Sequence, residues 1–496
     1  MAQVEKLISP ESKLMKKTTG VHTSSGVTRF RTVSNLLVIA LFGGLFGMLM
    51  SCGDGGSGNT TLPPTPTTTI QVNMGDAPAD WVLSFTTTIN SVSLNRSIGS
   101  TNMSANAPAI ELMQLMGTMQ PVALVPIPQG SYTGATVTFG NCNVTYIDPS
   151  TGAITQTTLQ GPFSTTVNFD SPVTLGTTPL VFNFDLDLNN SLTANTNNNL
   201  AFSPKFHFAL GTQGQGNQND PANGGMQQMM GAVNSFSNGV MTMTALQAAQ
   251  TFTIKTNTAT QYQGIATNPG MMNAGMGVLV NATLQSDGSL LATQIASRTQ
   301  SGGAMGGGII TEATGTPATQ LTLVMQNGAG AGMMSNYFSK TVTVDLTSTT
   351  QYEVNDEGVD LNSLPFTPFF DASNIYPGQS VIPVSESSGM MAGSGMMGSS
   401  SATITASSVY LREQGFRGTT DVAITPGASG TFTLTLPADC AFSKLTGATS
   451  LLIYQQTGTN VMNETEIAAG ATLRIHGLLL KNAGQWTVIA STIATY

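Results

Sequence analysis

Charged residues are scarce in this chain: only 8% of its 496 residues are Asp, Glu, Lys or Arg. They give a formal net charge of −9, and six of the 16 basic residues precede position 52, so the rest of the chain is more acidic still. A surface that is sparsely charged and acidic lacks the cationic patch with which proteins hold phosphate backbones or anionic lipid. The composition therefore argues against nucleic acid as a partner.

Cysteine and histidine are rare as well, with three of each. Zinc-finger spacings, C-x-x-C pairs and the G-x-S-x-G elbow of serine hydrolases do not occur. Downstream of Cys52 the histidines are His207 and His476, both in strand-like segments, which favours a structural role over that of a catalytic base. Whether Cys142 and Cys440 pair stays open, because a disulfide needs Cα atoms within about 7 Å. The sequence predicts no enzyme, no cofactor and no metal-ligating residues.

Long hydrophobic runs are limited to one segment, residues 36–50 (LLVIALFGGLFGMLM). It is shorter than the roughly 20 residues that a membrane-spanning helix needs. A basic stretch precedes the run, and the small residues Ser51, Cys52 and Gly53 surround or follow its end, which is the order of a secretion signal. A single transmembrane anchor with an incidental cysteine is the alternative.

The end of this segment, L-M-S-C, resembles the lipobox of bacterial lipoproteins. The resemblance implies that residues 1–51 are a signal peptide, that cleavage falls between Ser51 and Cys52, and that Cys52 carries the lipid. Gly53, where inner-membrane lipoproteins have Asp, implies the outer membrane. Residues 52–67 are rich in Gly, Ser, Pro and Thr, and we expect them to form a flexible tether. The expected location is the cell envelope, with the lipid anchor holding the protein to a membrane.

What the chain has in quantity is Thr, Val, Gly and Asn, and 40% of its residues are hydrophobic, enough to bury real cores. This composition favours strands and turns over helices, so we expect an all-β protein. Residues 68–212 show the alternation of strands, and several short strands between turn signals suggest a β-sandwich. In Val181–Leu188 the apolar residues alternate with Asn183, Asp185 and Asp187, which predicts a half-solvated strand with these three on the wet face.

Three motifs in this first region carry a resemblance to a known family. They are G-D-A-P at Gly75–Pro78, I-N-S-V-S-L at Ile89–Leu94, and I-P-Q-G-S-Y-T at Ile127–Thr133. The region resembles a family of uncharacterised secreted domains found in bacterial lipoproteins. That family has no established activity, so the resemblance implies a fold and not a function. Within G-D-A-P, we expect Asp76 to cap a turn with its own side chain.

The rest of the chain contains a diverged repeat. Thr251–Tyr262 (TFTIK…TQY) matches Thr341–Tyr352 (TVTVD…TQY), and Thr431–Thr435 (TFTLT) supplies a third copy. A strand led by glycine follows each copy, and an alanine-containing strand closes each unit: Gly277, Gly378 and Gly470 lead, and Leu291–Ser297, Ala402–Val409 and Trp486–Ala494 close.

These repeats predict three units, at residues 226–300, 305–413 and 414–496. Four to five strands in each fit a small closed β-barrel of the OB type. The units resemble a second uncharacterised family that commonly follows the first in such lipoproteins, most clearly at Leu473–Gly477 (LRIHG). The expected fold is thus a β-sandwich followed by three small OB-like β-barrel repeats.

Glycine- and methionine-rich stretches interrupt the first two repeats. They are Met226–Met230, Gly270–Gly277, Gly302–Gly308, Gly328–Met334 and Gly389–Gly398. Thioethers are soft ligands that select Cu(I), so a copper- or metal-handling lipoprotein is one alternative function; drifted, glycine-rich loops are the plainer interpretation.

Other candidate sites have weaker patterns. Asp185-x-Asp187-x-Asn189 has the start of a calcium loop but lacks its Gly and closing Glu, and the cluster of Asn355, Asp356, Glu357 and Asp360 fits a solvated turn. A hydrolase with an unrecognised carboxylate pair is a second alternative function, because the separation of such a pair is set in space.

The sequence favours a non-enzymatic, lipid-anchored envelope protein with a binding or structural role. A glycan or an envelope protein is the expected ligand, by analogy with other sandwiches and barrels. Aromatic side chains that could stack on a glycan, although core packing is the more common fate, are Trp81, Tyr132, Tyr146, Tyr410 and Trp486.

Overall fold

The computed structural model describes most of the chain from residue 65 onward. Within 65–496 the residues left out are 78, 106–108, 116–118, 149, 195–199, 213–224, 246–249, 265–269, 271, 298–302, 305, 327–338, 355–358, 386–401, 463–465 and 496. Thr65–Tyr496 form one compact unit, and Met1–Pro64 are a separate unit outside the described residues. The expected signal peptide, Ser51, Cys52 and most of the tether lie there, as do the methionines of Gly328–Met334 and Gly389–Gly398.

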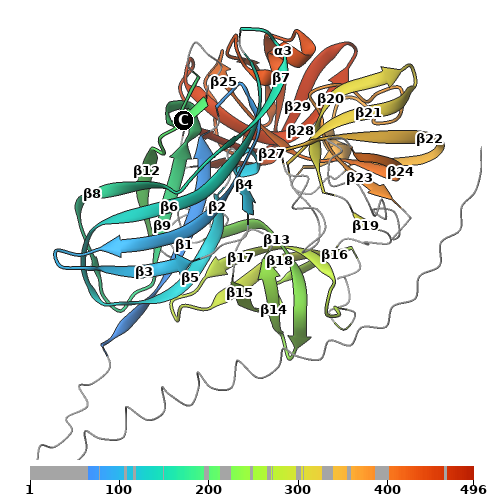
Figure 1. The fold of residues 1–496 in the computed structure, drawn as a ribbon. Helices are drawn as coiled ribbons and strands as arrows, with labels where there is room; N and C mark the ends of the chain where they lie inside the picture. Colours follow the sequence, from blue (N-terminus) through green and yellow to red (C-terminus); the bar gives the residue numbers. More distant parts are fainter. Residues whose placement is uncertain are drawn as a thin grey trace, which may run out of the picture. The chain divides into compact units, whose positions relative to one another are not determined.

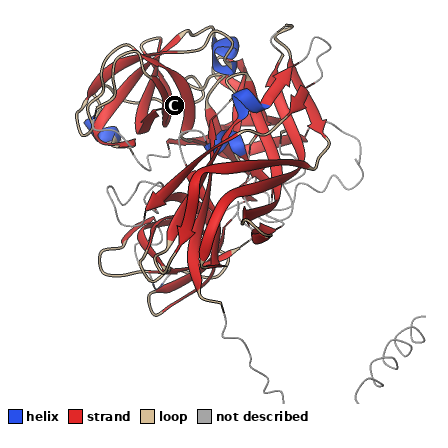
Figure 2. Ribbon diagram, turned by 90° about the vertical axis from the view of Figure 1, so that its left-hand side faces the viewer, coloured by secondary structure: helices blue, strands red, loops and turns tan. Residues whose placement is uncertain are grey.

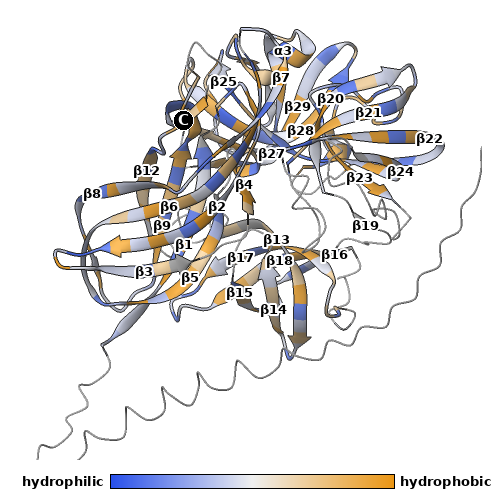
Figure 3. Ribbon diagram, in the orientation of Figure 1, coloured by the Kyte–Doolittle hydropathy of each residue, from blue (hydrophilic) through white to orange (hydrophobic). Residues whose placement is uncertain are grey.

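The described residues are almost entirely β-structure, as the composition predicts (Figures 1 and 2). None of the helices in the described residues is long and apolar enough to span a bilayer. Polar and apolar residues alternate along many strands, β22 (Thr341–Val354) among them (Figure 3).

Two sheets make up the first domain. The first has the strand order β12 (Phe206–Thr212), β9 (Leu180–Asp187), β1 (Thr67–Ala77), β5 (Met119–Pro128). The second has the order β3 (Ser100–Ala105), β2 (Val82–Asn95), β6 (Gly130–Ile147), β7 (Ile154–Leu159), with β4 (Ala109–Glu111) on β2 and β8 (Phe163–Leu175) on β6. Short elements complete it: η1 (Leu112–Leu115), α2 (Leu188–Ser191), β10 (Leu192–Ala194) and β11 (Leu200–Phe202).

Aromatic side chains fill the space between these sheets. Phe182 and Phe184 of β9 are fully buried with Phe85 of β2 and Phe139 of β6. Phe169 of β8 stacks on Phe208 of β12, with ring centroids 4.1 Å apart. Both sheets therefore share one core, which is the sandwich that the alternation predicts.

Three rings of strands follow the sandwich. The first comprises β13 (Gly225–Ser237), β14 (Val240–Ala245), β15 (Thr251–Lys255), β16 (Gln261–Gly264), β17 (Gly277–Leu284) and β18 (Leu290–Ser297). The second comprises β19 (Gly303–Ala304), β20 (Gly308–Gly315), β21 (Ala318–Met325), β22, η6 (Leu361–Ser363), β23 (Ser380–Ser385) and β24 (Ala402–Leu411). The third comprises β25 (Gln414–Thr420), β26 (Gly430–Thr435), α3 (Ala441–Thr446), β27 (Ser450–Met462), β28 (Thr472–Asn482) and β29 (Gln485–Thr495).

All three rings have the same topology. The third is a closed barrel of order β25-β26-β27-β29-β28, and the pairs β15–β18 and β23–β24 close the first two in the same order. In each, the third main strand runs parallel to the last and the other neighbours are antiparallel. The strands led by Gly277, Gly378 and Gly470 are the fourth in each ring, in agreement with the sequence pattern.

One strand of the predicted repeat was aligned wrongly. Thr251 and Thr341 open the third main strand of their barrels, but Thr431 lies in β26, the second strand of the last barrel. The strand equivalent to β15 and β22 is β27, whose sequence, SLLIYQQTGTNVM, has lost the T-x-T opening. A second T-x-T strand in the same barrel took its place in the pattern.

The first methionine-rich stretch is part of a barrel and not an insertion. Met226 and Met229 lie in β13 and are buried, together with Met241 and Met243 of β14 and with Met272. A flexible thioether chain fits this position well, because the Cβ that Gly231 lacks would collide with Met243. These methionines are core residues of the first barrel.

Candidate functional site: a buried polar joint

The polar face of β9 is buried, contrary to the prediction of a half-solvated strand. Asn183, Asp185 and Asp187 are 1%, 7% and 4% exposed. Barrels from later in the chain cover this face: Val181 packs in the core of the first barrel, and Arg474 of the third barrel binds Asp185. Alternation along one strand reports its two faces but not what distant parts of the chain place on them.

Buried amides form a ladder along this face of the first sheet. Gln71 donates to Asn73 and Asn73 donates to Asn183, each over 2.9 Å. Farther along the sheet, the side chain of Gln250 pairs with both backbone groups of Leu124, at 2.9 and 2.7 Å. Hydrogen bonds thus replace the water that the prediction placed here.

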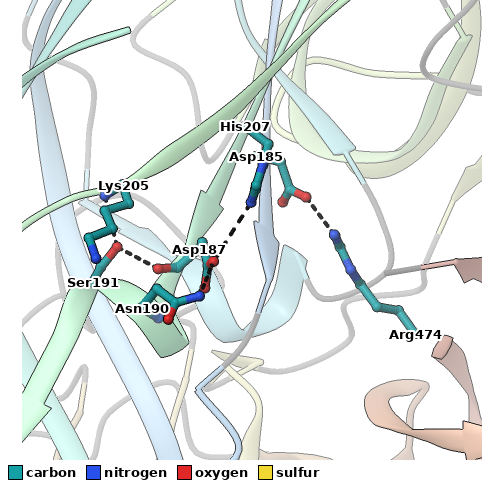
Figure 4. A network of polar contacts seen from close by, with 7 residues as sticks. All are labelled: Asp185, Asp187, Asn190, Ser191, Lys205, His207 and Arg474. Atoms are coloured by element: carbon teal, nitrogen blue, oxygen red, sulfur yellow. Dashed lines mark hydrogen bonds and ion pairs between the residues drawn. The ribbon is translucent and has the colours of Figure 1, made fainter. Parts of the chain in front are cut away.

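Two arginines of the last barrel bind two aspartates of the sandwich. Arg417 of β25 and Arg474 of β28 are directly paired across these strands. The Nη2 of Arg474 donates to Oδ2 of Asp185 over 2.6 Å, and Nη1 of Arg417 lies 3.0 Å from Oδ2 of Asp80 (Figure 4 shows the first pair). All four side chains are at most 20% exposed. We call these four residues the arginine clamp.

The backbone reinforces the clamp beside Asp80. The amide of Ala441, at the start of α3, donates to the carbonyl oxygen of Asp80 over 2.6 Å. Burial raises the pKa of the Asp80 carboxyl to about 6, although Arg417 opposes this, and Asp439 adds to the increase. The joint therefore costs desolvation energy on the sandwich side.

Asp76 of the G-D-A-P motif does not cap a turn. It lies within β1 and is fully buried, and neither of its carboxyl oxygens has a hydrogen-bond partner among the described residues. Burial first, and the charge of Asp185 second, raise its pKa well above the ordinary range, while Arg474 opposes the shift. The strand continues past the position where the turn was expected because β9 pairs with β1 as far as Ala77.

Asp187 has a structural role. Its side chain caps α2 by accepting from the backbone and side-chain nitrogens of Asn190, at 3.0 and 2.6 Å, and it lies 3.7 Å from the exposed His207 (Figure 4). The described residues contain no group of three or more His, Cys, Asp or Glu side chains placed to hold a metal ion. Asp185 and Asp187 thus belong to a joint and a helix cap; residues 355–358 of the other acidic cluster lie outside the description.

Glu111 is the centre of a second buried network, between the sandwich and the second barrel. It accepts from Ser84 and Thr86 at 2.6 and 2.8 Å and from the backbone of Phe85 at 2.7 Å. The hydroxyl of Ser339 lies 2.7 Å from that of Ser84, so the second barrel joins the network. Burial raises the pKa of Glu111 to about 7, and the hydrogen bonds, led by that from Ser84, limit the increase.

Apolar contacts join three domains beside these polar ones. Leu83 and Ile147 of the sandwich, Ile309 and Val324 of the second barrel, and Ala441 of the third form one buried cluster. The side chain of Gln326 donates to the carbonyl oxygen of Leu83 over 2.7 Å. The joint is therefore packed like the interior of a domain, with its polar groups placed inside it.

The remaining histidine does not form a catalytic triad. Nδ1 of His476 and Oγ of Ser491 both contact the same oxygen of Glu413, at 2.8 and 2.7 Å, and all three residues are buried. Nucleophilic catalysis needs the serine on the histidine, with the carboxylate behind it. Here the carboxylate lies between them, which is an arrangement suited to holding the start of the last barrel.

The cysteines and aromatic candidates are core residues. Cys142 and Cys440 are both free and buried, so they do not pair, and burial raises the pKa of Cys142 to about 12. Core or half-buried positions hold all five aromatic candidates: Trp81, Tyr132, Tyr146, Tyr410 and Trp486.

Sequence reasoning missed Arg417, Arg474, Glu111 and Glu413. One signal was present: charges are rare in this chain, and Arg474 stands within an apolar strand, L-R-I-H. A charge on such a strand either faces water or faces a partner, and the partner lies 289 residues away.

Comparisons with known proteins agree with the two resemblances at the level of domains. Residues 67–204 match the model of a domain of unknown function, DUF4382, and residues 230–296 match that of another, DUF5666. No curated protein matches.

Two solved structures show only a remote likeness. One is "drosophila Unr CSD456" (11% identity, 61% of this chain and 89% of that chain, TM-score 0.13). The other is a multidomain protein with nucleic acid binding domains from Streptococcus pneumoniae (10% identity, 53% and 72%, TM-score 0.10). At such TM-scores the likeness carries no argument about this chain. The comparisons therefore show two domains of unknown function within an all-β protein.

Proposed function

We propose that this chain is a lipid-anchored protein of the cell envelope, probably best described as a pre-assembled scaffold that binds a glycan or another envelope protein. The observation that carries the proposal is the use made of its rare charged groups. The clamp, Glu111 and Glu413 are all buried at joints between domains or within them. Chemistry-bearing side chains here hold domains together, which suits a structural or binding role better than catalysis.

The anchor follows from the sequence. The lipobox-like end of residues 36–52 supports lipidation of Cys52 after cleavage behind Ser51, and Gly53 supports the outer membrane. The three rings support the OB type through their five main strands and closure. Barrels and sandwiches of this kind offer loops and sheet faces to ligands.

Fatty-acid labelling of cells that produce the full chain tests the anchor. We expect the wild-type protein to incorporate an alkyne-tagged fatty acid and to sediment with the outer membrane, and Cys52→Ser to do neither. Cys142→Ser is the matched control and should be labelled normally. Label retained by Cys52→Ser, or an intact amino-terminal extension in the mass spectrum of the native protein, would contradict the proposal.

Retention on immobilised envelope fractions tests the binding role. The purified mature domains should retain a glycan or an envelope protein in a saturable manner, and heat-unfolded protein should not. Failure to retain either class from the envelope of the producing cell would remove the binding part of the proposal and leave the structural part.

A further inference from the structure

The position of Asp76 sets it apart from the other acids of the chain. Its side chain is fully buried, and both oxygens lack a hydrogen-bond partner among the described residues. The second oxygen of Asp185, which Arg474 does not bind, is buried and unpartnered in the same way. Unpaired carboxylate oxygens inside a protein are costly, so the ionic state of this group needs an account.

The charges around Asp76 do not balance if every acid is ionised. Asp185 and Asp187 of β9 and Glu111 next to η1 face it from the sandwich, and Arg474 of β28 faces it from the last barrel. Arg474 is committed to Asp185 at 2.6 Å. One guanidinium among several buried carboxylates leaves an excess of negative charge, which a protein relieves by keeping one carboxyl protonated.

The surroundings of Asp76 come from both sides of the joint. Strand β1 packs against η1, and β25 of the last barrel packs against η1 from the other side. The neighbouring part of the joint holds Asp80, Arg417 and Asp439. Separation of the last barrel would therefore remove Arg474 and admit water to this corner of the sandwich.

We propose that Asp76 carries a proton while the last barrel is docked on the sandwich and releases it when the two separate. The O–H bond of the carboxyl then breaks, the electron pair stays on Asp76, and water takes the proton. A rise in pH consequently favours the open joint, and a fall in pH favours the docked one. This makes the arginine clamp a proton-linked joint.

Hydrogen exchange of the full mature chain between pH 5 and pH 9 tests the proposal. Peptides from β9 and β28 report on the joint, after correction for the chemical pH dependence of exchange. One proton released per opening raises the opening constant by up to about tenfold per pH unit. Asp76→Asn, which keeps the shape and cannot ionise, should lose one proton's share of that slope. Asp170→Asn, an exposed aspartate of β8, is the matched control and should keep it.

Two results would overturn the proposal: a wild-type slope equal to that of Asp76→Asn, or a slope of opposite sign. Glu111→Gln separates the contribution of the second barrel, because Glu111 also titrates within this range. If Asp76→Asn does not fold, infrared difference spectra of the wild-type protein decide. They should show a protonated-carboxyl band that disappears as the joint opens, and absence of that band in the docked state would contradict the proposal.

Discussion

Single residues in this protein owe their properties to what buries them. Glu111 shows it most clearly, because four donors surround it and its pKa is still raised to about 7. Desolvation outweighs the hydrogen bonds, so the folded protein binds a proton there more tightly than the unfolded chain does.

We therefore expect the stability of the folded domains to depend on Glu111. With a folded pKa above the unfolded value, the contribution is fully present below about pH 4.5 and is lost as pH rises through about 7. The difference amounts to roughly 3 kcal/mol at about 1.4 kcal/mol per pH unit. Urea unfolding of Glu111→Gln should show a flatter pH profile than the wild-type protein over this range. A profile unchanged by the substitution would show that Glu111 is ionised in the folded state.

At the scale of elements, a buried threonine recurs at one place in all three barrels. Thr260, Thr350 and Thr459 each accept a hydrogen bond from the backbone amide three residues earlier, at 3.0, 2.8 and 2.8 Å. Each also donates to the carbonyl oxygen of an alanine in the last strand of its barrel, at 2.8, 2.8 and 2.7 Å. This hydroxyl satisfies the backbone where the third strand bends.

We expect Thr459→Val to cost about 1–3 kcal/mol of stability, because it leaves a buried amide and a buried carbonyl without partners. Thr457→Val is a matched control at an exposed position two residues earlier and should change little. Thermal unfolding of both variants measures the difference. Equal midpoints would show that water replaces the hydroxyl.

The repeat shows how far the sequence predicts such elements. T-Q-Y at Thr260 and Thr350 marks the position of this hydroxyl, and the glycine-led and alanine-containing strands are found in their predicted places. In the third copy the same position reads Thr459-Asn460-Val461, so the letters changed while the hydrogen bonds did not. Local patterns predicted strands and barrels well; they could not predict the burial of Asp185, which depends on a barrel far along the chain.

At the scale of the whole molecule, the arginine clamp joins the first domain to the last. Removing one arginine leaves a buried aspartate without its counter-charge, which typically costs about 3–5 kcal/mol. We expect Arg474→Gln to weaken the docking of the last barrel, with faster proteolysis at the joint, and Asp185→Asn in the same chain to recover part of the loss. Lys255→Gln breaks the exposed pair with Asp287 and should have little effect. Loss in the double variant equal to or greater than that in Arg474→Gln would mean that the pair does not act as a unit.

Contact between the sandwich and the last barrel also has a topological consequence. Asp80 and Arg417 are far apart in sequence, and their pairing closes the intervening chain into a loop that encloses the two other barrels. A single nick inside that loop would leave two pieces that still grip each other. The protein is therefore built to survive one backbone cut in a hostile surrounding, and its two halves, produced separately, should reassemble by fragment complementation.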